Sequence, residues 1–162
     1  MNNKPIKRSE NIAPFSRDHH AGLLFCWKIK EGLRKETPLF KILSYMNFFW
    51  DHHLKEHFRE EEALLFDCLN DELSRQGKTE HLMLEQQLQH LNHNGSETSA
   101  AYLSFVDLLT KHIRFEERTL FPHLEGALPE SVLASIGAYL SGQHAFTDDY
   151  PDEFWSKSYT SL

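Results

Sequence analysis

The sequence predicts an all-α fold: an antiparallel four-helix bundle with an appended C-terminal helix and tail. Apolar residues recur three and four positions apart in four long stretches, which is the period of an α-helix with one buried face. The alternating pattern typical of β-strands is absent. Two of the long stretches contain the same motif, HxxxEExxLF, at residues 57–66 and 112–121. A chain of 162 residues is expected to form a single domain, with the bundle at about 15–125 and the C-terminal helix and tail at 126–162.

The first helix is expected from Ser16, whose hydroxyl suits a helix N-cap, to about Leu33. The polar residues 1–14 before it include two prolines and are predicted to form a loosely held arm. His19 lies nearer the centre of the apolar stripe of this helix than His20 does. The other residues of the stripe are Leu23, Cys26, Trp27 and Leu33.

The second helix is expected to begin near Pro38, because proline is tolerated in a first helical turn. Its apolar stripe includes Leu43, Met46, Trp50, His53 or Leu54, His57, Glu61, Leu64 and Cys68. His57 and Glu61 thus occupy positions at which the pattern otherwise has apolar residues. Residues 70–77 are predicted to end this helix and to form a turn.

The third and fourth helices are predicted at residues 79–91 and 100–121, with a connector at 92–99. His81 lies on the apolar stripe of the third helix, and His112 and Glu116 lie on that of the fourth. An acidic residue precedes both His19 and His81, so the two helix pairs form a weak internal repeat. Pro122 is expected to end or bend the fourth helix. A shorter helix follows at 130–141, and the tail from residue 144 is expected to be irregular and to pack across the bundle.

The two copies of the motif each place a histidine and a glutamate four residues apart on a buried helix face. A buried carboxylate is costly unless it is paired or bound to a metal, so two such pairs predict a binuclear metal site. Imidazole and carboxylate groups suit iron, manganese or zinc. The candidate ligands are His19 or His20, His57, Glu61, His81, His112 and Glu116.

Further residues are candidates for the same site. His53 lies one turn before His57 and could support a ligand or relay a proton. Glu85 follows His81 by four residues and forms a third HxxxE pair, although its flanks are less apolar. Glu60, Glu62 and Glu117 are expected on the outer face or around the ligands.

Composition excludes several classes of function. The formal net charge of −7 argues against a nucleic-acid partner. No stretch resembles a membrane span or a signal peptide, so a cytoplasmic protein is expected. The two cysteines, Cys26 and Cys68, lie among apolar residues and are expected to be buried free thiols. The sequence offers neither a glycine-rich phosphate loop nor a nucleophile–base pair, and it leaves the oligomeric state open.

The repeated HxxxEExxLF motif, with proline after its second copy, resembles the hemerythrin-like HHE cation-binding family over about residues 15–125. The resemblance implies a four-helix bundle that holds a non-haem di-iron centre. It also implies that the ligand positions are those of His19, His57, Glu61, His81, His112 and Glu116. Oxygen-carrying hemerythrins have a second histidine in the third helix and an aspartate in the fourth. This chain has Glu85 and Glu116 at those places, which argues against reversible oxygen carriage.

The expected function is therefore that of a cytosolic di-iron protein that binds or senses O₂, NO or peroxide, or that buffers iron. Manganese or zinc could replace iron at the same site. One alternative is an oxidase or peroxidase that uses the same pair of metals. Another is a helical interaction module whose buried polar residues bind no metal. Steady turnover with a reductant would identify the enzyme, and purified protein without stoichiometric metal would identify the module.

Overall fold

The computed structural model describes residues 8–93, 98–143 and 145–157. It confirms the predicted all-α fold, and the described residues include no strand. The elements are α1 (Ala13–Arg34), α2 (Leu39–Phe49), η1 (Trp50–Leu54), α3 (Lys55–Glu61), η2 (Glu62–Phe66), α4 (Asp67–Leu69), α5 (Glu72–His93), α6 (Ser99–Phe115), η3 (Glu116–Leu120), α7 (Phe121–Ala127) and α8 (Glu130–Ser141). Within these ranges, no helix is both long enough and apolar enough to cross a lipid bilayer.

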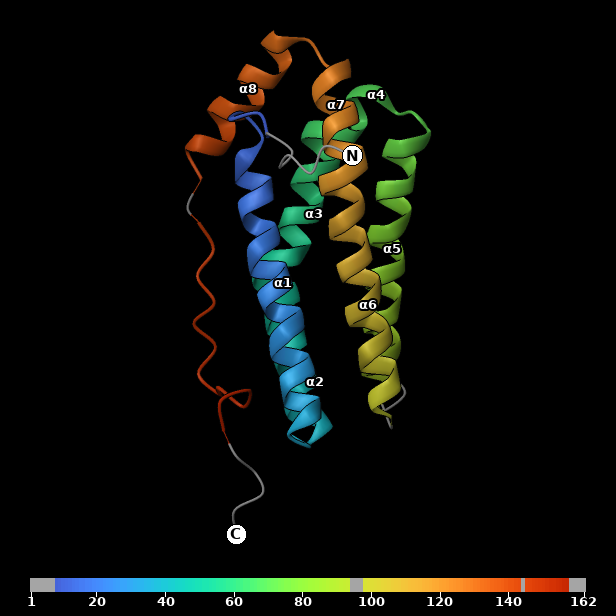
Figure 1. Cartoon of the computed structure of the whole chain (residues 1–162), viewed down its shortest axis with the longest axis vertical. Coiled ribbons are helices and arrows are strands. Elements are labelled where there is room, and N and C mark those ends of the chain that lie inside the picture. The colour runs from blue at the N-terminus through green and yellow to red at the C-terminus, as the bar shows by residue number, and fades with distance from the viewer. Residues whose placement is uncertain (1–7, 94–97, 144, 158–162) are drawn as a thin grey trace, which may run out of the picture.

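Four long rods lie side by side along the molecule (Figure 1). They are α1, the run from α2 to α4, α5, and the run from α6 to α7. The helix α8 lies at the end of the bundle where α1 begins, and the chain after it returns along α1. The rods are therefore arranged as a four-helix bundle with an appended helix and tail, as predicted.

The two rods that carry the repeated motif are interrupted by π-helical turns. The backbone N–H of Asp67 bonds to the carbonyl of Glu62, and the N–H of Phe121 bonds to that of Glu116. Both are i→i+5 bonds, and such π turns are frequent at functional sites. A π turn holds more residues than an α turn, so Phe66 reaches the core together with Glu61.

The core consists of two apolar clusters with polar residues between them. One cluster includes Phe25, Phe49 and Phe105, and the other includes Phe15 and Phe121. Along each rod, the six strongest candidates lie at or next to the boundary between the two clusters. The site is therefore enclosed by hydrophobic packing on both sides, which keeps bulk water away from it.

The tail packs on the bundle as predicted. Phe154 is fully buried, and it lies against Gly32 of α1. The buried Lys28 forms an ion pair with Asp148 at 2.9 Å, and its Nζ lies 4.3 Å from the centre of the Trp155 ring. These contacts fix the C-terminal segment along α1.

Three helix boundaries differ from the prediction. The first helix begins at Ala13 and not after Ser16, because Ile12 and Phe15 are anchored in the core. The third helix begins at Glu72, so most of the predicted turn at 70–77 is helical. Pro122 does not end the fourth rod, because it lies in the first turn of α7, where its missing N–H is tolerated.

The turn predicted up to Gly77 is wrong at its C-terminal end. Gly77 is a helical residue of α5, and a Cβ there would lie 2.9 Å from the Phe66 ring. The residue is therefore small because two helices approach closely at this point. The real turn consists of Asn70, with φ of 50°, and Asp71, whose carboxylate accepts a hydrogen bond from the N–H of Ser74.

The predicted burial of three side chains is wrong. Leu23 and Trp27 are 41% and 51% exposed, because the buried stripe of α1 passes through Gly22 and Cys26 instead. Cys26 is buried as expected, whereas Cys68 is exposed, since the π turn η2 rotates the residues that follow it.

The predicted loose arm is also partly wrong. Ile12 is buried, and Arg8 forms ion pairs with acidic residues of the fourth rod. Residues 1–7 of the arm, residues 94–97 of the predicted connector, and residues 144 and 158–162 of the predicted tail lie outside the described residues.

Candidate metal centre

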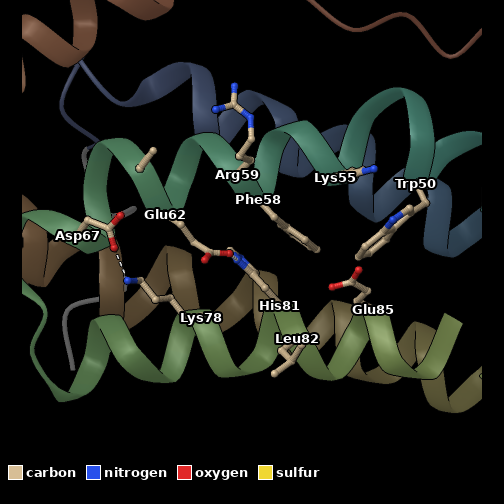
Figure 2. Close-up of a pocket in the computed structure, with 11 residues that line it drawn as sticks. Trp50, Lys55, Phe58, Arg59, Glu62, Asp67, Lys78, His81, Leu82 and Glu85 are labelled. Carbon is tan, nitrogen blue, oxygen red and sulfur yellow. Dashed lines mark hydrogen bonds and ion pairs between the residues drawn. The ribbon is translucent and has the colours of Figure 1, made fainter. Parts of the chain in front are cut away.

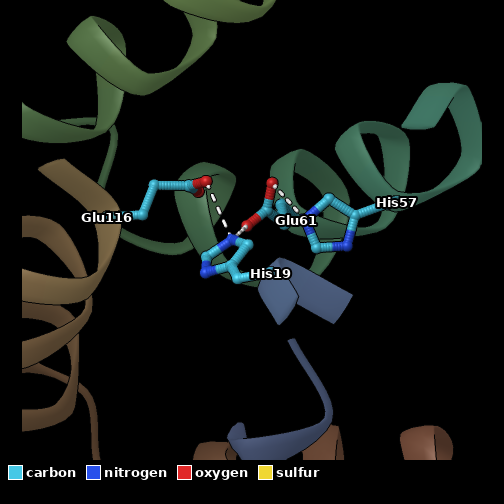
Figure 3. Close-up of side chains that lie close together, drawn as sticks. All are labelled: His19, His57, Glu61 and Glu116. Carbon is cyan, nitrogen blue, oxygen red and sulfur yellow. Dashed lines mark ion pairs between the residues drawn. The ribbon is translucent and has the colours of Figure 1, made fainter. Parts of the chain in front are cut away.

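The six strongest candidates converge at the centre of the bundle. They form two groups, each with ligand atoms that lie within 4.8 Å of one another. The first group is His19, His57, Glu61 and Glu116, and the second is Glu61, His81, His112 and Glu116. Both glutamates are fully buried, and the histidines are at most 4% exposed. Figure 3 shows the first group, with Glu61 between His57 and His19 and with Glu116 on the other side of His19.

All four histidines turn the same nitrogen toward the two glutamates. In the first group, the Nε2 atoms of His57 and His19 lie 3.2 Å from Glu61 Oε1 and from Glu116 Oε1, respectively. In the second group, the Nε2 of His81 lies 3.3 Å from Glu61 Oε1, and that of His112 lies 2.8 Å from Glu116 Oε1. Each glutamate therefore faces histidines of both groups.

The other ring nitrogen of each histidine contacts a carboxylate. We call these four carboxylates the carboxylate ring. The Nδ1 contacts are His57 to Asp18 at 3.0 Å, His81 to Glu62 at 2.9 Å, His112 to Glu80 at 2.8 Å, and His19 to Glu117 at 2.7 Å.

The carboxylate ring is continuous around the bundle. Asp18 of α1 contacts the histidine of α3, and Glu62 of η2 contacts the histidine of α5. Glu80 of α5 contacts the histidine of α6, and Glu117 of η3 contacts the histidine of α1. Each of the four is adjacent in sequence to a member of the central groups. When Nδ1–H donates to a carboxylate, the lone pair of Nε2 is free and directed to the centre, as metal binding requires.

The central atoms satisfy the conditions for binding a cation. The Nε2 atoms of His19, His81 and His112 and all four oxygens of the two glutamates are buried, and within the described residues none forms a hydrogen bond of regular geometry, although these atoms lie as close as 2.8 Å to one another. A buried polar group without a well-formed hydrogen bond costs about 1–3 kcal/mol, so a cluster of them destabilises the bundle unless something binds there. Two imidazole nitrogens and two carboxylates in each group form a donor set that suits iron, manganese or zinc.

The electrostatics of the site also favour positive charge. Burial opposes protonation of His57 and His112, but nearby Glu61 and Glu116 outweigh it and raise the pKa values to about 9 and about 10, respectively. Burial similarly opposes ionisation of Glu61, whereas His57 and His19 hold its pKa well below the usual range. The acidic side chains around the site thus stabilise positive charge there.

The remaining candidates lie outside both groups. His20 and Glu85 are exposed, which leaves His19 as the inward histidine of α1. His53 is buried, and its ring stacks on that of Phe146 at 4.3 Å and lies 5.7 Å from that of His57. Burial lowers the pKa of His53 to about 4, so this ring is neutral at pH 7. Glu60 is half-buried and belongs to neither group.

The sequence contained a signal for the carboxylate ring. Glu62 and Glu117 are expected either on the outer face or around the ligands, and the structure places both against candidate histidines. In the sequence, Asp18 and Glu80 stand out only as acids that precede a histidine. Their role could not be inferred, because each one contacts the histidine of a different helix and not its sequence neighbour.

A cavity of about 560 Å³ opens beside the second group, between α3 and α5 (Figure 2). His81 and Glu62 lie at its inner wall, and Trp50 and Glu85 line its other end. The ring of Phe58 stacks on that of His81 at 3.9 Å and is only 5% exposed. The cavity therefore brings solvent to the outer side of a candidate ligand, and an aromatic ring shields the centre.

Comparison with known proteins agrees with this geometry. Neither the comparison with curated proteins nor that with solved structures gives a significant match. The family model described as Hemerythrin HHE cation binding domain, however, matches residues 12–124. This range contains both copies of the motif and all six converging residues. The chain therefore belongs to the hemerythrin HHE cation-binding domain family.

Proposed function

We propose that this chain holds two iron ions between its four helices and uses the pair to bind or sense O₂, NO or peroxide, or to buffer iron. The observation that carries the proposal is the sharing of Glu61 and Glu116 by two groups, each of which has its own two histidines. Because the four histidines divide into two groups, each of two ions would be held by two histidines and would share both glutamates. Four protein ligands per ion would be fewer than the roughly six that iron usually takes, so a small molecule could bind as well.

The donor set supports the choice of iron. Neither group contains a cysteine, so the thiolate sites typical of structural zinc are not formed here. A pair of iron ions supplies redox-active chemistry that one zinc ion does not. The carboxylate ring holds each histidine with its Nε2 toward the centre, and the two apolar clusters exclude bulk water.

The cavity between α3 and α5 supports the proposed size of the ligand. Phe58 and His81 pack face to face at its inner wall, so only a small molecule would pass without a large rearrangement of this stack. Diatomic molecules and peroxide meet this condition. The cavity lining mixes Lys55, Arg59 and Lys78 with acidic residues, which suits a ligand without strong charge of either sign.

The proposal is tested with protein that is loaded with ferrous iron in the absence of oxygen. Stoichiometric amounts of O₂, NO and hydrogen peroxide are added in separate experiments, and the optical spectrum is followed. Zinc-loaded protein is the matched control, because zinc has no redox chemistry. We expect the spectrum of the iron form to change with at least one reagent, and that of the zinc form with none.

Iron buffering is tested in parallel by transfer of iron to a weak chelator. If the iron form responds to none of the three reagents and also gives up its iron at once, the proposed function is wrong.

A further inference from the structure

Arg8 precedes the first helix, yet its side chain is only 9% exposed. Its Nη2 donates to the backbone carbonyl of Glu117 at 2.7 Å and to Oε2 of the same residue at 3.0 Å. Its Nη1 forms an ion pair with Glu125, and the N–H of Ser9 donates to the other oxygen of that carboxylate at 2.7 Å. The guanidinium also lies 5.3 Å from the centre of the Phe121 ring.

The carbonyl that Arg8 contacts is left free by the local backbone. In the π turn η3, the N–H of Phe121 bonds to the carbonyl of Glu116. The next bond in this register would run from residue 122 to the carbonyl of Glu117, but residue 122 is a proline and has no N–H. Arg8 supplies the missing donor, so it stabilises the backbone of the motif at the point where the π turn ends.

The carboxylate of the same glutamate connects Arg8 to the metal centre. Its Oε2 accepts from Arg8, and its Oε1 accepts from Nδ1 of His19 at 2.7 Å. Both oxygens of Glu117 are thereby fixed, and with them the tilt of the imidazole that places Nε2 beside Glu116. Arg8 and His19 therefore hold this one carboxylate from opposite ends.

We infer that Arg8 is a positioning residue for the half of the metal centre that contains His19 and His57, and that it acts through Glu117. The inference rests on the proposed function. If Arg8 only anchored the segment before α1, its loss would lower stability without changing how the chain binds a metal. If it positions Glu117, its loss must weaken one of two metal-binding steps.

The test uses cobalt(II) alone as the probe, titrated into the full-length apo protein and followed by its visible absorption bands. We expect Arg8→Gln to weaken one of the two binding steps by about 10- to 100-fold, as is typical when a group supporting a ligand is removed. Arg34→Gln is the matched control, because Arg34 is exposed on the last turn of α1 and, within the described residues, forms its ion pair with Glu31 of the same helix. This control should bind cobalt as the wild type does.

A double variant decides whether Arg8 acts through Glu117. Arg8→Gln combined with Glu117→Gln should bind cobalt no more weakly than Glu117→Gln alone, because the path is already interrupted. Arg8→Lys keeps the charge without the two-pronged contact, so it should weaken the same step by less, and it provides the measurement if Arg8→Gln does not fold.

Wild-type affinity in both Arg8 variants, or an additive loss in the double variant, would overturn the inference. Failure of the proposed function gives a different result: the two-metal site fails if the wild type itself binds fewer than two cobalt ions, and the proposed reactivity fails in the separate experiments with iron-loaded wild-type protein.

Discussion

His19 and Glu117 are 98 positions apart in the chain, yet Nδ1 of the histidine lies 2.7 Å from Oε1 of the glutamate. This contact between α1 and the fourth rod closes the carboxylate ring, since the other three contacts lead from α1 to the fourth rod through the remaining helices. All four histidines are thereby held with the same nitrogen toward the centre. The orientation of the predicted ligands depends on residues that are not ligands.

Neutralising one member of the carboxylate ring should weaken metal binding without removing a ligand. Glu80→Gln keeps an oxygen that can accept from Nδ1 of His112 but loses the charge, so the imidazole becomes a poorer donor to a metal. We expect metal affinity to fall by about tenfold. Glu85→Gln is the control, because Glu85 is exposed on the same helix and belongs to neither group, and it should leave affinity unchanged. Equal affinities for the two variants would contradict the role of the ring.

The loss of a shared candidate ligand and the loss of an unshared one should leave different numbers of metal ions per chain. Glu61 belongs to both groups, whereas His81 belongs to one. His81→Ala is therefore expected to retain one ion per chain, held by the first group, while Glu61→Ala should lose most of both. The check is elemental analysis of each variant after anaerobic loading and gel filtration. If Glu61→Ala retained more metal than His81→Ala, the shared position of the glutamate would be disproved.

The stability of the metal-free protein should fall as the pH rises above neutrality. The folded pKa values of His57 and His112, about 9 and about 10, lie above the usual value of 6.5, so protonation of these histidines stabilises the folded chain. This contribution is complete below pH 6.5 and is lost as the pH rises through 9 and 10. Metal binding has the opposite dependence, because a metal competes with protons for the same nitrogens.

The gap in melting temperature between metal-loaded and metal-free protein should accordingly be narrow at pH 5 and widen towards pH 9. Differential scanning calorimetry of both forms over this range measures the gap. A gap that is constant, or that narrows with rising pH, would mean that the histidines do not bind the metal.

Two glycines provide a matched test of helix packing near the site. An added Cβ at Gly77 would lie 2.9 Å from the Phe66 ring, whereas one at Gly126 would meet no atom within 4 Å. Gly77→Ala should lower the free energy of unfolding by about 1–3 kcal/mol through overpacking. Gly126→Ala should raise it by about 0.5–1 kcal/mol, because alanine favours a helix more than glycine does. Urea denaturation of the two variants distinguishes these signs.

The fold and the central residues could be predicted because they depend on local periodicity. The spacing of His57 and Glu61 within an apolar stripe is visible in the sequence, and so is its repetition at His112 and Glu116. When a helix is regular, polar residues at positions of its apolar stripe must face the interior of the bundle. The structure places these residues together with His19 and His81 at the centre of the bundle.

The errors arose where tertiary contacts override the local pattern. Gly77 suggests a turn in the sequence, but a glycine is needed there because the Phe66 ring packs against its Cα. Gly22 lies in the buried stripe of α1, but a glycine is not counted as apolar when the stripe is predicted from the sequence. Cys68 follows a π turn, which shifts the helical register in a way that periodicity does not reveal. The role of Arg8 depends on a contact with a carbonyl 109 positions away, for which the sequence offers no local signal.

The number of metal ions per chain tests the central claim most directly. Protein purified without oxygen, loaded with ferrous iron and freed of excess metal by gel filtration should contain two iron ions per chain by elemental analysis, because two groups of ligands share Glu61 and Glu116. A value of one ion or none would contradict the account. A single tightly held zinc ion in the protein as purified would contradict it as well.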